Sequence, residues 1–256
     1  WATKTYYDLD SHTGGKAPDG FQSVLTRDQW ISVLEFVKTV GGKLMISVGN
    51  CEGNHPDGGA IDISQTKAIF DFSAQYGVPI SAIEFMNEPN MLEFSGAPKG
   101  YTPADYIRDQ DIVNGWVREN YPDCLIVGPS TTDSHVLSAG PGQAKGGAGI
   151  GDILPSCPTA ALLEGHQVKL DHFTYHFYNG CSDRLASVMP EAHWNPEEAD
   201  SEAYLAHAGN GARAYVPYRD KYVPGGQMWI TEAGDAGGGG DTWASTYLDV
   251  LRTLNE

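Results

Sequence analysis

The sequence predicts an α/β fold in which parallel strands alternate with helices, as in a (β/α)8 barrel of the TIM type. Short apolar runs suited to buried strands recur along the chain, and amphipathic stretches at helical spacing lie between them. Five such runs are clear, which gives about five to six βα units, whereas a full barrel has eight. We therefore expect a single catalytic barrel domain over residues 1–256, incomplete here because the chain is a segment of a longer protein.

The expected strands are short and rich in Ile, Val, Leu, Met and aromatic residues. This composition is typical of strands that are buried on both faces of a parallel sheet. The segment before Thr26 shows at most a trace of a strand, at residues 3–9. The five clear strands are expected at 43–49, 83–86, 124–129, 172–178 and 228–231.

The expected helices carry recognisable start and stop signals. Thr26 is a suitable N-cap for a helix over 27–40, and Gly41 is a suitable residue to end it. Thr102 and Pro103 open a long helix that reaches Asn120, because proline at the first helical position lacks only an N–H that would be unpaired anyway. A helix is expected at 65–76 after a Ser64 cap, with Ile69 and Phe72 facing inward. Further helices are expected within 197–222 and at 242–254.

Charge and composition exclude several classes of partner. The formal net charge of −17 opposes binding to nucleic acid, anionic membranes and sulfated polymers. No apolar run approaches the about 20 residues needed to cross a bilayer. Scarce Lys, abundant Tyr, Trp and Gly, and a start at Trp1 without Met or a signal peptide favour a mature secreted or periplasmic protein.

The four cysteines do not have the spacing of a zinc site, because no CxxC or CxxH pair occurs. Cys157 and Cys181 fall in loops on the same barrel face, and a disulfide between them is the favoured pairing. Buried free thiols are the alternative.

Two glutamates carry the strongest functional signal. Glu88 follows the apolar run at 82–86, and Glu232 ends the run at 228–231. In a parallel barrel, side chains at the C-terminal strand ends point into one cleft, so the two carboxylates are expected to face each other there. Paired carboxylates of this kind cleave glycosidic bonds.

Neighbouring residues fit the same chemistry. One carboxylic acid must protonate the leaving oxygen, which requires a raised pKa, while the other must attack as a carboxylate, which requires a lowered pKa. Asn87 is placed to hydrogen-bond the sugar 2-hydroxyl. His176 and Tyr178, at the end of the preceding strand, are placed to keep Glu232 ionised. These side chains supply acid, base and nucleophile, so no metal or cofactor is predicted.

The motifs resemble known glycosidases. Asn87-Glu88-Pro89 after one strand, with Glu232 about three units later, resembles the clan of (β/α)8 retaining glycosidases. The segments 84–90, 127–129, 174–178 and 230–233, with the glycine run at 237–240, are most similar to the heparanase and β-glucuronidase family, glycoside hydrolase family 79. The N-terminal segments 1–7 and 20–30 add to that similarity.

The resemblance implies a retaining β-glucuronidase-like enzyme that acts by double displacement on a carbohydrate substrate. It implies that Glu88 is the proton donor, Glu232 the nucleophile, Asn87 the residue beside the donor, and His176 and Tyr178 contacts of the nucleophile. The family's first and eighth barrel strands, its β-sandwich and its basic residues for sulfated heparan are not found here. A non-catalytic carbohydrate-binding barrel and a β-xylosidase, β-glucosidase or β-galactosidase of the same clan remain open.

Overall fold

A computed structural model of the chain describes residues 4–132, 156–181, 186–187, 190, 193 and 201–236. The expected helix at 242–254 and the glycine-rich segments at 140–151 and 237–240 lie outside these residues. Within them, no helix is long and apolar enough to cross a membrane.

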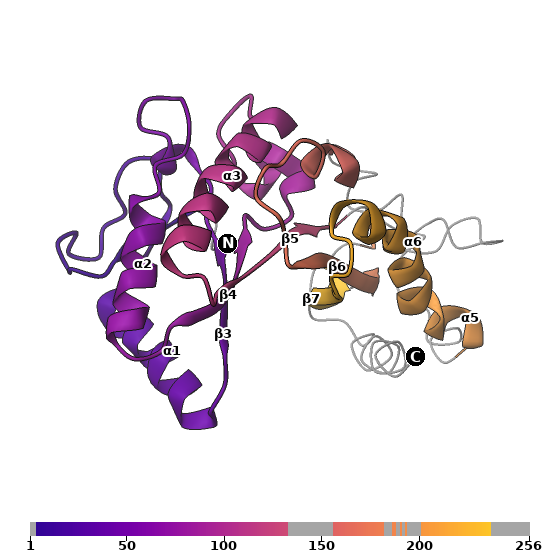
Figure 1. Cartoon of the computed structure of the whole chain (residues 1–256), viewed down its shortest axis with the longest axis horizontal. Helices are drawn as coiled ribbons and strands as arrows, with labels where there is room; N and C mark the ends of the chain where they lie inside the picture. The colour runs from indigo at the N-terminus through magenta and orange to yellow at the C-terminus, as the bar shows by residue number, and fades with distance from the viewer. Residues whose placement is uncertain are drawn as a thin grey trace.

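The centre of the fold is a five-stranded parallel sheet whose strand order follows the sequence, β3-β4-β5-β6-β7. Strands β1 and β2 form a separate parallel pair. Figure 1 shows the sheet curling between α1, α2 and α3 on one side of the molecule and α5 and α6 on the other. This curved sheet is part of a (β/α) barrel, as predicted, and it is incomplete within the described residues.

The strands are parallel within each sheet and are joined by helices or long loops. The strands are β1 (Thr5–Asp8), β2 (Ser23–Thr26), β3 (Leu44–Val48), β4 (Ile80–Phe85), β5 (Leu125–Thr131), β6 (His172–Cys181) and β7 (Met228–Ala236). The α-helices are α1 (Arg27–Val40), α2 (Ser64–Gln75), α3 (Pro103–Asn120), α5 (Glu202–Leu205) and α6 (His207–Tyr222). Short 3₁₀ helices are η2 (Glu52–Asn54), η3 (Pro89–Ser95) and η5 (Thr159–Leu162).

Local capping chemistry accounts for the helix boundaries that the sequence predicted. Thr26 accepts a hydrogen bond from the backbone of Gln29, whose side chain accepts one from Thr26, and Gly41 ends α1 in the left-handed conformation. Thr102 and Asp105 form the same reciprocal pair at the start of α3. These contacts satisfy backbone N–H groups that the first helical turn leaves unpaired.

Three details differ from the expectation. Ser64 is the first residue of α2 rather than its cap. Phe70, fully buried against Trp116, fills the core position that was expected for Phe72, while Phe72 is half-buried and stacks on Tyr76. Strand β2, which the sequence did not predict, is short and pairs only with β1 among the described strands, so a four-residue run carried too little pattern to be distinguished from a loop.

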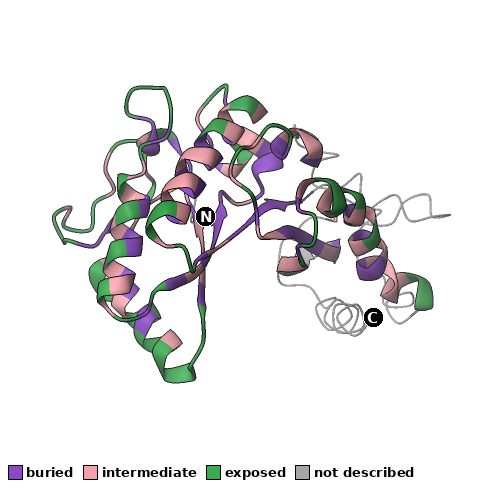
Figure 2. Cartoon of the chain, in the orientation of Figure 1, coloured by how far each residue is buried: buried purple, intermediate pink, exposed green. Residues whose placement is uncertain are grey.

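Alternation along the strands separates two layers. Phe85 of β4 packs on Tyr106 of α3, with ring centroids 5.4 Å apart, and Tyr175 of β6 packs on Tyr215 of α6 at 4.7 Å. Their sequence neighbours Glu84 and His176 therefore point to the opposite, inner side of the sheet. Figure 2 shows the buried strands between helices whose outer faces are exposed. The apolar core thus lies between sheet and helices, and the inner side of the sheet carries polar groups.

We expect Leu34→Ala to lower the free energy of unfolding by about 2–5 kcal/mol, the usual cost of a cavity at a fully buried leucine. The matched control is Phe36→Ala on the same helix, because Phe36 is 65 % exposed. Denaturant unfolding of both variants measures the difference. Equal losses would mean that α1 does not bury the face described here.

Candidate active site

The two predicted glutamates come together at the C-terminal edge of the sheet. Glu88 follows β4 and precedes η3, and Glu232 lies within β7, which continues past it to Ala236. One carboxylate oxygen of Glu88, one carboxylate oxygen of Glu232 and one ring nitrogen of His176 all lie within 4.8 Å of one another. The folding of the chain therefore brings the two carboxyl groups close together at one edge of the sheet.

His176 joins the two carboxylates. Its Nδ1 lies 2.9 Å from Glu88 Oε1 and 3.7 Å from Glu232 Oε2, and its Nε2 lies 2.9 Å from Ser130 Oγ. The imidazole and the Glu88 carboxyl are both buried. The sequence associated His176 with Glu232, but in the structure its shorter contact is with Glu88.

The remaining predicted residues lie at the same edge. The Tyr178 hydroxyl donates a hydrogen bond to Glu232 Oε1, as the sequence suggested. Asn87 is half-buried beside Glu88, and its side chain forms no hydrogen bond with the residues that the structure describes. It is therefore available to a ligand in the cleft.

The pKa of Glu232 is raised, which corrects the expectation that its neighbours lower it. Burial is the main cause, because it disfavours the ionised carboxylate; the negative charges of Glu88 and Glu84 act in the same direction, and His176 acts against them. The hydroxyl of Tyr178 orients Glu232, but the low-dielectric surroundings determine the direction of the shift.

The sequence did not single out Glu84, although it lies on the inner face of β4, four residues before Glu88. Ser47 of β3, in register with it, donates to Glu84 Oε2 at 3.2 Å, while Glu84 Oε1 is buried and has no hydrogen-bond partner among the described residues. A half-satisfied buried carboxyl is costly, and such groups collect at functional sites. Its position on the same face as the glutamate pair, which strand alternation could have indicated, explains its electrostatic effect on Glu232.

Backbone strain is concentrated around Glu88. Met86, Glu88 and Ser130 have φ values of 64°, 47° and 57°, a region that non-glycine residues seldom occupy. Neighbouring groups hold this conformation: the Glu88 N–H donates to the Ser130 carbonyl at 3.1 Å, and the Ser95 hydroxyl donates to the Glu88 carbonyl at 2.7 Å. Strained residues of this kind are characteristic of functional sites.

Asn90 anchors the same loop to the end of β5. Its Nδ2 donates to the Thr132 carbonyl and its Oδ1 accepts from the Thr132 N–H, both at 3.0 Å. The side chain thus replaces a strand partner for Thr132. Asn90 is the last residue of the segment 84–90 that resembles the glycosidases, and in the structure its side chain holds this loop in place.

Two irregularities in strand pairing determine the directions of side chains at the site. Between β5 and β6, Pro129 pairs with Thr174 and Thr131 with Tyr175, so Ser130 is an extra residue. Between β6 and β7, Tyr175 pairs with Ile230 and His176 with Glu232, so Thr231 is the extra residue. Such bulges redirect side chains. Without the second one, Thr231 rather than Glu232 would lie opposite His176.

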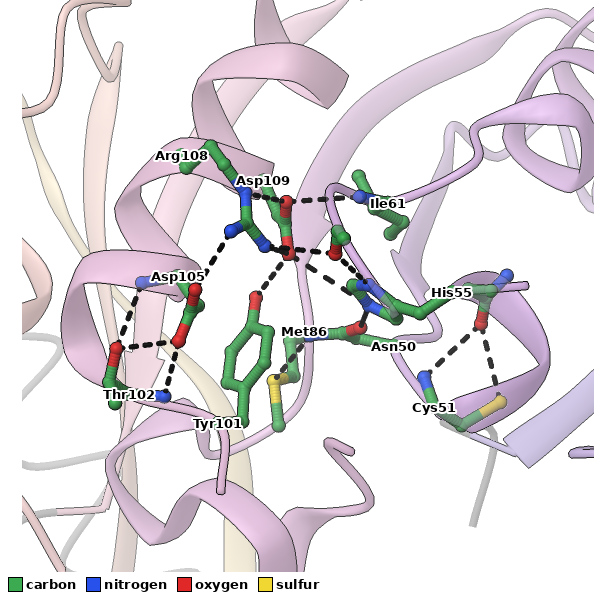
Figure 3. Close-up of polar contacts among 12 residues, drawn as sticks. Asn50, Cys51, His55, Ile61, Met86, Tyr101, Thr102, Asp105, Arg108 and Asp109 are labelled. Carbon is green, nitrogen blue, oxygen red and sulfur yellow. Dashed lines mark hydrogen bonds and ion pairs between the residues drawn. The ribbon is translucent and has the colours of Figure 1, made fainter. Parts of the chain in front are cut away.

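A buried polar cluster holds the neighbouring loops in place (Figure 3). Asp109 of α3 accepts hydrogen bonds from the Ile61 N–H at 3.1 Å, the Tyr101 hydroxyl at 2.8 Å and the Arg108 guanidinium. His55 lies between the Gly59 carbonyl and Asn50 Oδ1, and Asn50 contacts the Met86 sulfur at 3.7 Å. The cluster connects the loop after β3 with α3 and with the residues that lead to Glu88.

Four aromatic residues, Phe94, Tyr101, Trp194 and Trp243, are of a type that stacks on sugar rings, although aromatic residues more often serve in packing. Tyr101 is buried and bonded to Asp109, so it is a packing residue. Phe94, in η3, is 56 % exposed and remains available to a ligand. Trp194 and Trp243 lie outside the described residues.

Other reactive side chains are not part of this cluster. Cys51 and Cys124 are buried free thiols, whereas the side chain of Cys181 is outside the description, so its pairing with Cys157 stays a prediction. Asp8, Asp10 and His12 bring three potential cation ligands together near the N-terminus, but two of them are exposed, and the Asp8 carboxylate already accepts hydrogen bonds from Thr13. The prediction that no metal or cofactor takes part stays a prediction.

Comparison with known proteins gives the fold. No protein-family profile and no curated protein sequence matches the chain. Among solved structures, an endo-laminarinase from Formosa has a TM-score of 0.52 at 14 % identity, covering 98 % of this chain and 65 % of that one. A family 44 endoglucanase from Clostridium thermocellum has a TM-score of 0.51 at 15 % identity, covering 89 % and 57 %. The chain therefore spans less than two thirds of either structure.

The raised pKa of Glu232 links the stability of the folded protein to pH. The folded protein keeps this proton at pH values where an unfolded chain, with the ordinary value of 4.5, has released it. The group's contribution to stability is fully present below that value and is lost as pH rises through the folded-state pKa.

We expect Glu84→Gln to lower the pKa of Glu232, because one neighbouring negative charge is removed.

Carbon-13 NMR titration of labelled glutamate side chains measures the effect. Glu119→Gln, which changes an exposed carboxylate at the far end of α3, is the matched control and should leave the pKa of Glu232 unchanged. An unchanged Glu232 titration in Glu84→Gln would remove Glu84 from the electrostatics of the site.

Proposed function

We propose that the protein is a retaining glycoside hydrolase, in which Glu88 is the acid/base and Glu232 the nucleophile. The observation that supports this most directly is the proximity of the two carboxylates, because one oxygen of each lies within 4.8 Å of the other. Retaining enzymes hold their carboxyl groups about 5–5.5 Å apart, whereas inverting enzymes need about 6.5–9.5 Å. The similarity in fold to a laminarinase and an endoglucanase agrees with this proposal.

The surroundings support the division of labour between the glutamates. Glu88 is buried and contacts His176, so its carboxyl is held where it can give a proton to a leaving oxygen and later take one from water. Glu232 is more exposed, with 34 % of its side chain accessible, and Tyr178 orients one of its oxygens. Its other oxygen is thus free to attack an anomeric carbon, while Asn87 binds the adjacent sugar hydroxyl.

The sugar that we propose is a β-glucuronide or a related β-glycoside, and the site of action is outside the cytoplasm. The uronate preference follows from the sequence similarity to glycoside hydrolase family 79, and the export from composition. The related clan activities, β-xylosidase, β-glucosidase and β-galactosidase, differ in the sugar alone and use the same carboxylate pair.

We expect Glu88→Ala and Glu232→Ala each to reduce the rate on unactivated glycosides by several orders of magnitude. The two defects should differ in kind. Glu88→Ala should keep much of its rate on aryl glycosides with good leaving groups, which need no proton, and azide should accelerate it. Glu232→Ala should be inactive on both. Glu119→Ala is the control for a carboxylate outside the site.

A panel of aryl β-glycosides, with calorimetry on the same sample, tests sugar and activity together. Turnover of the β-glucuronide supports the full proposal, and turnover of another glycoside alone assigns a different clan activity. Sugar binding without turnover would instead support a carbohydrate-binding barrel. Full retention of activity in either alanine variant would remove that residue from its role.

The activity should depend on pH as a bell-shaped curve with a mildly acidic optimum. Glu232 must be ionised to attack, and its raised pKa moves the acidic limb to a higher pH than an unperturbed carboxyl group would give. The basic limb reports the loss of the acid's proton. A profile of kcat/KM against pH measures both limbs, and a flat profile would contradict the assignment.

A further inference from the structure

Three contacts link Ser130, His176 and Glu88. Its carbonyl accepts a hydrogen bond from the Glu88 N–H at 3.1 Å, and its hydroxyl lies 2.9 Å from His176 Nε2. His176 Nδ1 in turn lies 2.9 Å from Glu88 Oε1. The contacts form a closed ring from the Glu88 backbone through Ser130 and His176 to the Glu88 carboxyl.

The members of the ring are buried. Ser130 is fully buried, His176 is 1 % exposed and Glu88 is 6 % exposed. Ser130 is the bulged residue of β5, with a φ of 57°, and its own N–H donates to Thr174 Oγ1 at 2.9 Å. A bulge with a left-handed backbone carries a cost, which is typical of positions that aim a functional group.

A serine hydroxyl fits the position chemically. A hydroxyl both donates and accepts, so it can pair with either form of His176 Nε2. When Glu88 is ionised, Nδ1–H donates to the carboxylate and Nε2 accepts from Ser130. When Glu88 is protonated on its other oxygen, Nδ1–H still donates to Oε1 and Nε2 still accepts from Ser130. The same three groups therefore provide good hydrogen bonds to both forms of an acid/base.

We propose that Ser130 is a positioning residue for Glu88. Its carbonyl holds the Glu88 backbone directly, and its hydroxyl holds the Glu88 carboxyl indirectly, through His176. The inference rests on the proposed function, in which Glu88 alternates between acid and base. Ser130 does not contact the substrate. It acts by keeping the Glu88 carboxyl in one orientation throughout the reaction.

The experiment compares Ser130→Ala with Thr131→Ala. Thr131 is the next residue of β5 and equally buried, and its hydroxyl contacts Thr159 at 2.9 Å outside the ring. We expect Ser130→Ala to lose up to about 100-fold in kcat/KM on alkyl glycosides, the scale of a slightly misplaced reacting group, and much less on dinitrophenyl glycosides. The basic limb of the pH profile of Ser130→Ala should also shift. Thr131→Ala should keep the wild-type ratio of kcat/KM on the two kinds of glycoside and the wild-type pH profile.

Ser130→Gly guards against a variant that fails to fold. Glycine adopts a positive φ readily and also lacks the hydroxyl, so Ser130→Gly should fold and show the same kinetic defect. Equal losses of Ser130→Ala or Ser130→Gly on both leaving groups, or no loss, would overturn the proposal.

A second readout does not depend on activity. Nitrogen-15 NMR of labelled histidine reports which ring nitrogen of His176 carries the proton, with the signal assigned by its loss in His176→Asn. We expect Ser130→Ala to change the tautomer or titration of His176, and Thr131→Ala to leave both unchanged. If the wild-type protein shows no glycosidase activity, the proposed function fails, and unchanged His176 signals in Ser130→Ala would then overturn this inference independently.

Discussion

The contact between the Glu88 carboxyl and the His176 ring is the constraint that organises the rest of the site. Two carboxylates and an imidazole lie within 4.8 Å at the edge of a parallel sheet, where most water is excluded. Like charges at this distance repel strongly unless a cation, a proton or hydrogen bonds compensate. His176, with Tyr178 and Ser130 beside it, provides that compensation.

This constraint explains the distortions of the sheet edge. A regular strand would give every second residue the same direction, and that spacing brings neither Ser130 to His176 nor Glu232 opposite it. The extra residues in β5 and β7 change the direction of the following side chains, and positive φ values occur at Met86, Glu88 and Ser130, where the Glu88 carboxyl meets His176. Asn90 and the Asp109 cluster then hold the distorted loops in place.

Much of the scaffold was predictable because its signals are local. The caps at Thr26 and Thr102, the glycine stop after α1 and the apolar strands β3 to β7 all follow from neighbouring residues in the sequence. The association of Glu88 and Glu232 also followed, because parallel strands end on one face. Short β2 and the inward turn of Phe70 were missed, since four residues or a single helical position carry little periodic information.

The details that determine chemistry were less predictable because they arise from tertiary contacts. Neither bulge has a local signal, so Ser130 could not be recognised as a partner of His176. The direction of the Glu232 pKa shift depends on burial and on Glu84, neither of which can be read from the residues that flank Glu232.

The left-handed backbone at Glu88 also has an evolutionary consequence. Glycine is the residue best suited to such a conformation, so the geometry favours replacing the glutamate with a residue that has no acid group. At this position a relaxed main chain and a carboxyl side chain are therefore competing requirements, and a stability screen would favour the residue without the acid.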